Sequence, residues 1–230
     1  METEFARQYY EAARADHWWF RGRKELIGEL LKRSSEDGGG RVVDLGAGSD
    51  TLFPEGFDVV KIDIVRPEGE LGRFVRASAM NLPFRDCSFQ GAGAFDVIEH
   101  VAEAEKLLGE LRRVIRPGGF VLATVPAHQW LWSPHDTNVG HVRRYEIGEL
   151  AEVFEEAEFD VVWCGTFYGF LILPALVRRV LGLATDMGDP PAPLNRLLTG
   201  FALRSVRSAL RGRRPGLSIA QAAVTRPPSN

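Results

Sequence analysis

The sequence has few cysteines and no long apolar run, and both shortages exclude common classes of protein. Its two cysteines, Cys87 and Cys164, lie far apart without CxxC spacing, so neither a disulfide framework nor a structural zinc site is expected. The longest apolar stretch, 167–177, contains Pro174 and falls short of the roughly 20 residues that span a bilayer. The first residues lack the basic segment and apolar run of a signal peptide. We therefore expect a cytoplasmic protein that does not cross a membrane.

The chain also lacks an overall excess of positive charge. Its formal net charge is −3, which argues against a nucleic-acid partner. From residue 166 onward, however, nine basic residues stand against two acidic ones, about +7. Residues 1–165 consequently carry about −10. The basic C-terminal part leaves open a local contact with phosphate groups or with an anionic membrane surface.

Hydrophobic patterning predicts an alternation of strands and helices. Seven β-like runs are expected, at 41–45, 58–64, 73–77, 91–98, 120–125, 160–165 and 217–225. Helical spacing predicts helices at 4–33, 103–115 and 147–157, a very short one after the first strand, and more within 167–214. This order is typical of a Rossmann-like α/β fold, a mostly parallel sheet with helices on both faces. We expect a single domain that consists of an N-terminal helical cap (1–40), a ligand-binding core (41–166), a helical insertion that forms a lid (167–214) and a final strand with its tail (215–230).

A glycine turn follows the first expected strand. The run Val42-Val43-Asp44-Leu45-Gly46-Ala47-Gly48 places an acidic residue at the end of a hydrophobic strand and continues into Gly-x-Gly. Glycines let backbone N–H groups approach a ligand at a helix N-terminus. Asp63 closes the second strand, at the distance where dinucleotide-binding folds carry the acidic residue that binds ribose hydroxyls. Together these residues predict a nucleotide-like ligand.

Three further segments stand downstream in fixed order: Ala79-Met80-Asn81-Leu82-Pro83-Phe84, then Phe95-Asp96-Val97-Ile98-Glu99-His100-Val101, then Arg116-Pro117-Gly118-Gly119-Phe120. With the glycine turn and Asp63, the set resembles the class I S-adenosylmethionine-dependent methyltransferases, in particular the small-molecule enzymes of types 11 and 23. The resemblance covers about residues 15–165 and, more loosely, the last strand. It implies a seven-stranded sheet whose last strand is antiparallel.

The resemblance also implies a cofactor, S-adenosylmethionine, which becomes S-adenosylhomocysteine. Asp44, Gly46 and Gly48 would surround its methionine moiety, Asp63 would hold the ribose, and Ala79 and Met80 would flank the adenine. Trp19 and Arg21 either close over the cofactor or belong, like Trp18 and Phe20, to a hydrophobic clamp. The complete set of implied cofactor contacts is Trp19, Arg21, Asp44, Gly46, Ala47, Gly48, Asp63, Ile64, Ser78, Ala79, Met80 and Phe95.

Two positions depart from the family pattern. Asp50 stands where relatives commonly carry a third glycine, and Ser78 where they often carry an aspartate. Serine can still hydrogen-bond an adenine amine. A carboxylate at position 50 repels the carboxylate of the cofactor unless it turns away or meets a cation.

The loop after the fifth expected strand holds three of the chain's five histidines. Histidine accepts protons near neutral pH, and the catalytic candidates are His100, His135, His141 and Tyr145. Alternatively, Asp136 and His141 pair with Arg143 or Arg144 to hold the loop, and Tyr145 packs beneath it. His128, His135 and His141 form no usual zinc pattern, so no metal site is predicted.

A helix over 194–211 would place apolar Leu197, Leu198, Phe201, Ala202 and Ala209 on one side. It would place Arg196, Arg204, Arg207 and Arg211 on a stripe. The helix is either a docked lid with a solvated face or a contact for phosphate or an anionic membrane, in which case the run 167–177 lines an apolar substrate pocket.

The sequence thus predicts methyl transfer to an O, N or C nucleophile of a small, partly apolar molecule, by a monomer or homodimer. The alternative is a non-catalytic binding partner or scaffold with the same fold. A nicotinamide-dependent dehydrogenase is disfavoured because the Leu82-Pro83 and Glu99-His100 segments would have no role there.

Overall fold

The computed structural model describes residues 17–35, 39–48, 50–66, 72–181, 190–212 and 215–226. Within them the strands form one seven-stranded sheet in the order β3-β2-β1-β4-β5-β7-β6. The first five strands are parallel, whereas β7 runs antiparallel to both of its neighbours, β5 and β6. The expected mostly parallel sheet with an antiparallel last strand is therefore confirmed.

The strand bounds differ from the expected ones mainly in the middle of the sheet. The strands are β1 (Gly40–Leu45), β2 (Phe57–Asp63), β3 (Arg73–Arg76), β4 (Phe89–Phe95), β5 (Ile115–Pro126), β6 (Phe159–Phe167) and β7 (Ser218–Thr225). β5 begins earlier than expected because Ile115 already pairs with Phe89, before the bulge around Gly118. β4 ends earlier because Ile98 starts the short 3-10 helix η1 (Ile98–His100).

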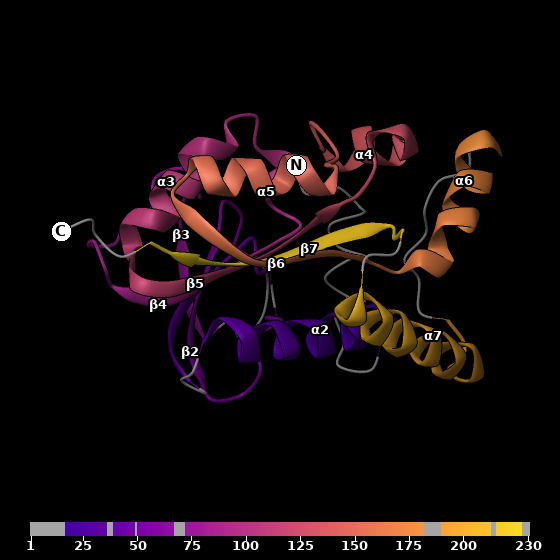
Figure 1. Ribbon diagram of the computed structural model, residues 1–230, viewed down its shortest axis with the longest axis horizontal. Helices are drawn as coiled ribbons and strands as arrows, with labels where there is room; N and C mark the ends of the chain where they lie inside the picture. Colours follow the sequence, from indigo (N-terminus) through magenta and orange to yellow (C-terminus); the bar gives the residue numbers. More distant parts are fainter. Residues whose placement is uncertain are drawn as a thin grey trace.

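Helices cover both faces of the sheet (Figure 1). α2 (Trp18–Ser34) and α7 (Ala192–Arg211) pack together on one face, where Leu26, Leu30 and Ala202 join a buried cluster with Val42 and Leu122. On the other face α3 (Ala104–Val114) and α5 (Ile147–Glu156) enclose the second cluster. β-strands with apolar residues on both faces are typical of such a three-layer arrangement.

The segments on either side of β1 agree with expectation only in part. α2 lies within the span expected to be helical at 4–33, and its N-cap is His17. The side chain of His17 accepts a hydrogen bond from the Trp19 backbone N–H at 3.3 Å. The described residues between β1 and β2, 50–56, contain no helix, since Pro54 and Gly56 interrupt the segment. The helical residues expected at 4–16 lie outside the described part of the chain.

Three short elements and α6 lie toward the edge of the sheet at which β5 ends (Figure 1). They are η2 (Gln129–Leu131), α4 (Pro134–Val139), η3 (Gly169–Leu171) and α6 (Ile172–Leu181). The Arg179 side chain of α6 donates to the Trp132 carbonyl oxygen at 3.1 Å, so α6 contacts the loop that follows β5. Among the helices that the structure describes, none combines the length and the apolar character needed to span a membrane.

Candidate functional site

The site is built around Asp44, at the carboxyl end of β1. Its side chain is 1% exposed, and Oδ2 accepts a hydrogen bond from the Thr51 hydroxyl at 2.5 Å. Oδ1 has no hydrogen-bond partner among the described residues. Burial raises the pKa of Asp44 to about 7, although the Thr51 hydrogen bond opposes this. A buried carboxylate oxygen without a donor is costly, so Asp44 is prepared to receive a donor or a cation from a ligand.

The glycine turn follows Asp44 directly and has the backbone that only glycine adopts without strain. Gly46 and Gly48 have φ angles of +61° and +56°. A β-carbon on Gly46 would lie 2.6 Å from Cγ2 of Val97, at the end of the neighbouring strand β4. The turn, with half-buried Ala47 between its glycines, therefore fits closely against β4, as a backbone cradle requires.

Asp50 meets a cation. Its carboxylate lies 3.1 Å from the Lys24 ammonium of α2, and both side chains are partly exposed. This ion pair supplies the counter-charge that the unusual carboxylate at position 50 requires.

Asp63, at the carboxyl end of β2, lies beside the segment that follows β3. The Asp63 backbone oxygen accepts from the Ala77 N–H at 3.1 Å, and its side chain accepts from the Val65 N–H at 3.1 Å. Ser78 starts the following turn, where its hydroxyl accepts from the Met80 N–H at 3.2 Å. Ile64 and Met80 are exposed, and Ala79 is half-buried. The parallel strands thus bring the residues expected around ribose and adenine together at the carboxyl ends of β2 and β3.

The residues predicted to close over the cofactor lie in two different places. Trp19 belongs to an aromatic cluster, with its ring 4.8 Å from that of Tyr168 and 5.5 Å from that of Trp18. Phe95 packs against Phe53 at 5.7 Å, on the same face of the sheet as α2. Trp19 thus ties the start of α2 to Tyr168, the residue after β6, whereas Phe95 packs against the segment between β1 and β2.

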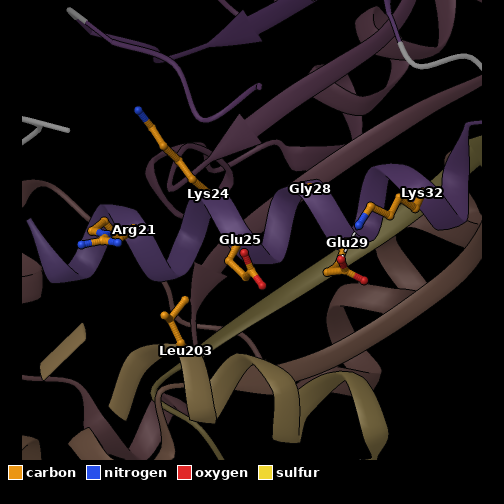
Figure 2. Close-up of a pocket in the computed structure, with 7 residues that line it drawn as sticks. All are labelled: Arg21, Lys24, Glu25, Gly28, Glu29, Lys32 and Leu203. Carbon is orange, nitrogen blue, oxygen red and sulfur yellow. Dashed lines mark hydrogen bonds and ion pairs between the residues drawn. The ribbon is translucent and has the colours of Figure 1, made fainter. Parts of the chain in front are cut away.

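Arg21, in contrast, lines a surface hollow of about 400 Å³ between α2 and α7 (Figure 2). Figure 2 shows Leu203 of α7 pointing toward α2, whose Lys24 points away from it. Apart from Arg21, none of the predicted cofactor or catalytic residues lines this hollow; its walls are Arg21, Lys24, Glu25, Gly28, Glu29, Lys32 and Leu203.

Arg23, which the sequence did not single out, is a charged residue of α2 that reaches the sheet. Arg23 is 1% exposed; its guanidinium donates to the Asp96 carboxylate and to the Thr124 hydroxyl. Asp96 follows β4 and has a φ of +57°. Burial alone would raise the pKa of Asp96, but the Arg23 guanidinium outweighs it and lowers the pKa. A basic residue at helical spacing with Phe20 and Ile27 was the available signal.

The residues after β4 and after β5 meet at this edge. Glu99 is completely buried, and potential ligand atoms of Glu99, His100 and His141 all lie within 4.8 Å of one another. The rings of His100 and His141 are 4.8 Å apart and perpendicular. Burial raises the pKa of Glu99 well above its usual range and lowers that of His100. The structure thus brings two of the predicted catalytic histidines together with a carboxyl group.

A buried ion-pair network holds the loop that carries His141. The Arg144 guanidinium donates to Asp136 at 2.8 and 3.0 Å, and His141 Nδ1 lies 2.9 Å from the same carboxylate. Although burial opposes it, hydrogen bonds from His141 and Arg144 lower the pKa of Asp136. The alternative in which Asp136, His141 and Arg144 fix the loop is therefore observed, whereas Arg143 pairs with Glu149 instead.

Tyr145 and His135 differ from the two clustered histidines. Tyr145 is 0% exposed and belongs to the hydrophobic cluster beneath the loop, and burial raises its pKa. His135 is half-buried with its ring 6.4 Å from that of His141, and burial lowers its pKa. His128 lies outside the cluster, 2.9 Å from Glu146.

Comparison with known proteins identifies what the chain is similar to. A family model described as a methyltransferase domain, Methyltransf_23, matches residues 15–163. The protein named probable S-adenosylmethionine-dependent methyltransferase Rv3030, from Mycobacterium tuberculosis, is 27% identical over 169 residues, which cover 67% of this chain and 60% of the relative. The chain therefore spans less than two thirds of that relative's length.

Solved structures share the fold at low identity. A chain of the Haloferax volcanii complex between the Trm112 methyltransferase activator and a methyltransferase aligns with a TM-score of 0.61 and 17% identity, over 96% of this chain and 95% of its own. Phosphoethanolamine N-methyltransferase 2 of Haemonchus contortus, in complex with S-adenosyl-L-methionine, aligns with a TM-score of 0.55 and 15% identity, over 88% of this chain and 52% of its own.

Proposed function

Because the chain belongs to the class I S-adenosylmethionine-dependent methyltransferase family, we propose that it transfers a methyl group from S-adenosylmethionine to an O, N or C nucleophile of a small, partly apolar molecule. The observation that carries the proposal is Asp44, a buried carboxylate with one oxygen that has no donor among the described residues, next to a glycine turn with positive φ angles. The ammonium group of the cofactor is a donor of the required charge.

The other residues at this edge fit the same cofactor. Asp63, at the end of β2, would accept hydrogen bonds from the ribose hydroxyls. Ile64, Ala79 and Met80 offer exposed or half-buried apolar surface for the adenine, and the hydroxyl of Ser78 could bind the adenine amine. The carboxylate of Asp50 would repel the carboxylate of the cofactor less strongly, because the Lys24 ammonium partly neutralises the Asp50 charge.

The cofactor supplies an activated methyl group, so the protein chiefly orients the acceptor and keeps water out. Where the acceptor must lose a proton, a neutral histidine at this edge accepts it. His100, His135 and His141 are the candidates. Tyr145 is less suited to this role, because it is enclosed in the core.

We also propose that α6 and α7 contact an anionic surface that carries phosphate groups. Arg196, Arg204, Arg207 and Arg211 are exposed along α7. Leu197 and Phe201, expected on the apolar side of that helix, are also exposed, because the buried stripe consists of Thr199, Ala202, Val206 and Ala209. Exposed basic and apolar side chains on one helix favour an anionic interface.

Calorimetry with S-adenosylhomocysteine tests the cofactor assignment. We expect one site per chain with a micromolar dissociation constant, and no heat from a nicotinamide dinucleotide used as the control. Absence of binding by S-adenosylmethionine and S-adenosylhomocysteine at about 1 mM would refute the proposed function.

A second experiment separates an enzyme from a scaffold. The protein is incubated with methyl-labelled S-adenosylmethionine and a metabolite extract, and labelled small molecules are counted. Label transfer that depends on the protein is expected. Cofactor binding without any transfer would favour a non-catalytic binding partner.

A further inference from the structure

Among the residues that the structure describes, no side chain or backbone group of another residue donates a hydrogen bond to the buried carboxyl group of Glu99. The side chain is 0% exposed, and both Oε1 and Oε2 lack a partner among the residues that the structure describes. Buried polar groups without partners are rare, and a buried carboxylate needs a cation or strong donors nearby. A cation bound beside Glu99 would therefore stabilise the ionised form of this carboxyl group.

The two neighbouring histidines are both oriented by an acceptor behind them. His100 Nδ1 lies 3.1 Å from the Gly140 carbonyl oxygen, and His141 Nδ1 lies 2.9 Å from the Asp136 carboxylate. Because these oxygens can only accept, Nδ1 of each ring carries the hydrogen, and in the neutral ring Nε2 has the lone pair. Nε2 of His141 lies 3.9 Å from Oε1 of Glu99.

This orientation is the one that metal-binding histidines require. In such sites the ring nitrogen that does not bind the ion donates to a carboxylate or a backbone carbonyl, which fixes the tautomer and the direction of the lone pair. Asp136 is in turn held by Arg144 and by the Ser133 backbone N–H, at 2.8 and 2.9 Å. The carboxylate behind His141 is thus itself held in place.

We propose that Glu99, His100 and His141 bind one divalent transition-metal ion. One potential ligand atom from each residue lies within 4.8 Å of the others, and ligand bonds of about 2.0–2.2 Å need only modest side-chain rotation to converge. Two imidazoles and a carboxylate suit Zn²⁺, Mn²⁺ or Co²⁺ better than Ca²⁺. Three protein ligands leave further positions open, which is typical of catalytic rather than structural sites.

The open positions also define the class of acceptor, a consequence that rests on the proposed function. The ion would bind a hydroxyl oxygen of the acceptor and lower its pKa. The hydroxyl proton leaves to His135 or to water, the oxygen forms the new O–C bond, and the bonding pair of the broken C–S bond returns to the sulfonium sulfur. A metal ion at this site would therefore favour an oxygen acceptor over an N or C nucleophile.

Metal titration tests the site without any need for a substrate. The chelator-treated protein is titrated with Co²⁺, monitored by its visible absorption, and Zn²⁺ is used to displace it. We expect one ion per chain. The Glu99→Gln and His141→Gln variants should lose more than about 100-fold in affinity, because even the supporting residues of a metal site are worth 10–100-fold. His128→Gln, outside the cluster on the same edge, should bind like the parent.

Folding and cofactor binding are measured separately on the same samples. His100→Gln changes an exposed ligand and provides a second ligand variant if Glu99→Gln does not fold. No Co²⁺ binding by the parent at about 1 mM, or equal affinity in a folded ligand variant, would overturn the inference. If the metal-free parent binds S-adenosylhomocysteine but no ion, only the metal site fails. If it binds the ion but no S-adenosylhomocysteine, the metal site stands and the proposed function fails.

Discussion

Two buried charged residues at the candidate site are treated in opposite ways by their surroundings. The Arg23 guanidinium reaches a carboxylate and a hydroxyl, so its charge is compensated by the protein itself. Asp44 accepts from a hydroxyl on one oxygen and has no partner on the other among the described residues. The first arrangement supports the fold, whereas the second is favourable only once a ligand arrives.

We predict that Asp44→Asn weakens S-adenosylhomocysteine binding by about 10–100-fold, the value of a charge-assisted hydrogen bond of about 1.5–3 kcal/mol. In the parent, affinity should fall as the pH drops below about 7, where Asp44 takes up a proton. The affinity of the Asn variant should not show this dependence. Calorimetry between about pH 5.5 and pH 8 measures both, and identical pH profiles would contradict the role of Asp44.

The raised pKa of Asp44 also predicts how the stability of the folded protein depends on pH. The pKa of Asp44 is about 7 in the folded protein against 3.8 as its ordinary value, so the folded state holds a proton that the unfolded chain has released. Between these two values the ligand-free protein should lose stability as the pH rises, by at most about 4 kcal/mol. Denaturant unfolding of the parent and of Asp44→Asn across this pH range isolates the contribution of Asp44 to the free energy of unfolding. A parent that gains stability relative to Asp44→Asn as the pH rises would contradict the prediction.

We predict that Arg23→Met destabilises the protein by about 3 kcal/mol, because the partly buried Asp96 carboxylate loses its cation. Arg21→Met is the matched control. It removes the same charge from an exposed position two residues earlier on α2 and should change stability by less than about 0.5 kcal/mol. Urea unfolding compares the two, and similar losses would show that the Asp96 pair adds nothing.

Sequence reasoning located the strand ends but could not rank the charged residues beside them. Asp44 and Asp63 were predictable because a strand followed by glycines fixes their distance along the chain. The role of Arg23 was not predictable, since it depends on contacts with Asp96 and Thr124, which are remote in sequence. The same holds for the meeting of Glu99 with His141, which required the path of the loop after β5.

At the level of elements, the glycine turn and helix α2 use glycine for different reasons. Gly46 needs a positive φ and lies against Val97, whereas Gly28 lies within α2 with nothing within 4 Å of an added β-carbon. The first glycine is a structural requirement. The second lowers the stability of α2, and no close contact or positive φ requires a glycine there.

The same substitution should therefore have opposite effects at these positions. Gly46→Ala should destabilise by about 1–3 kcal/mol, through strain and overlap with Val97, and should weaken cofactor binding. Gly28→Ala should stabilise by about 0.5–1 kcal/mol. Thermal unfolding and S-adenosylhomocysteine calorimetry measure both, and a neutral Gly46→Ala would mean that the turn adapts freely.

Element types were largely predictable, and most errors occurred where local signals competed. Strand periodicity gave all seven strands that the structure describes. The very short helix expected after the first strand was wrong, because Pro54 and Gly56 interrupt the described residues 50–56. The early start of β5 was hidden by Pro117 and Gly118, which usually end regular structure.

On the scale of the whole molecule, charge and apolar exposure are unevenly distributed. α6 exposes Leu173, Val177, Val180 and Leu181, with Val180 76% exposed, and α7 exposes its four arginines. Basic residues beside exposed apolar ones gain from both electrostatic attraction and apolar burial at an anionic interface.

We predict that the protein binds vesicles of anionic phospholipid at low salt and dissociates as salt rises, with no binding to neutral vesicles. The double variant Arg204→Glu and Arg207→Glu should reduce co-sedimentation by more than about 10-fold, because each basic residue contributes about 1 kcal/mol. A control variant, Arg85→Glu, changes an exposed arginine outside both helices. Equal loss in the control would assign the effect to net charge alone.

The position of β7 has a consequence for how the chain is made. β7 lies between β5 and β6 and pairs with both along its length (Figure 1). Until residues 218–225 have left the ribosome, β5 and β6 each present an open edge, and neither can pair with the other in the final register. Such edges promote association between nascent chains. Completion of the sheet is therefore a late, long-range event, which slows folding and exposes the protein to aggregation during synthesis.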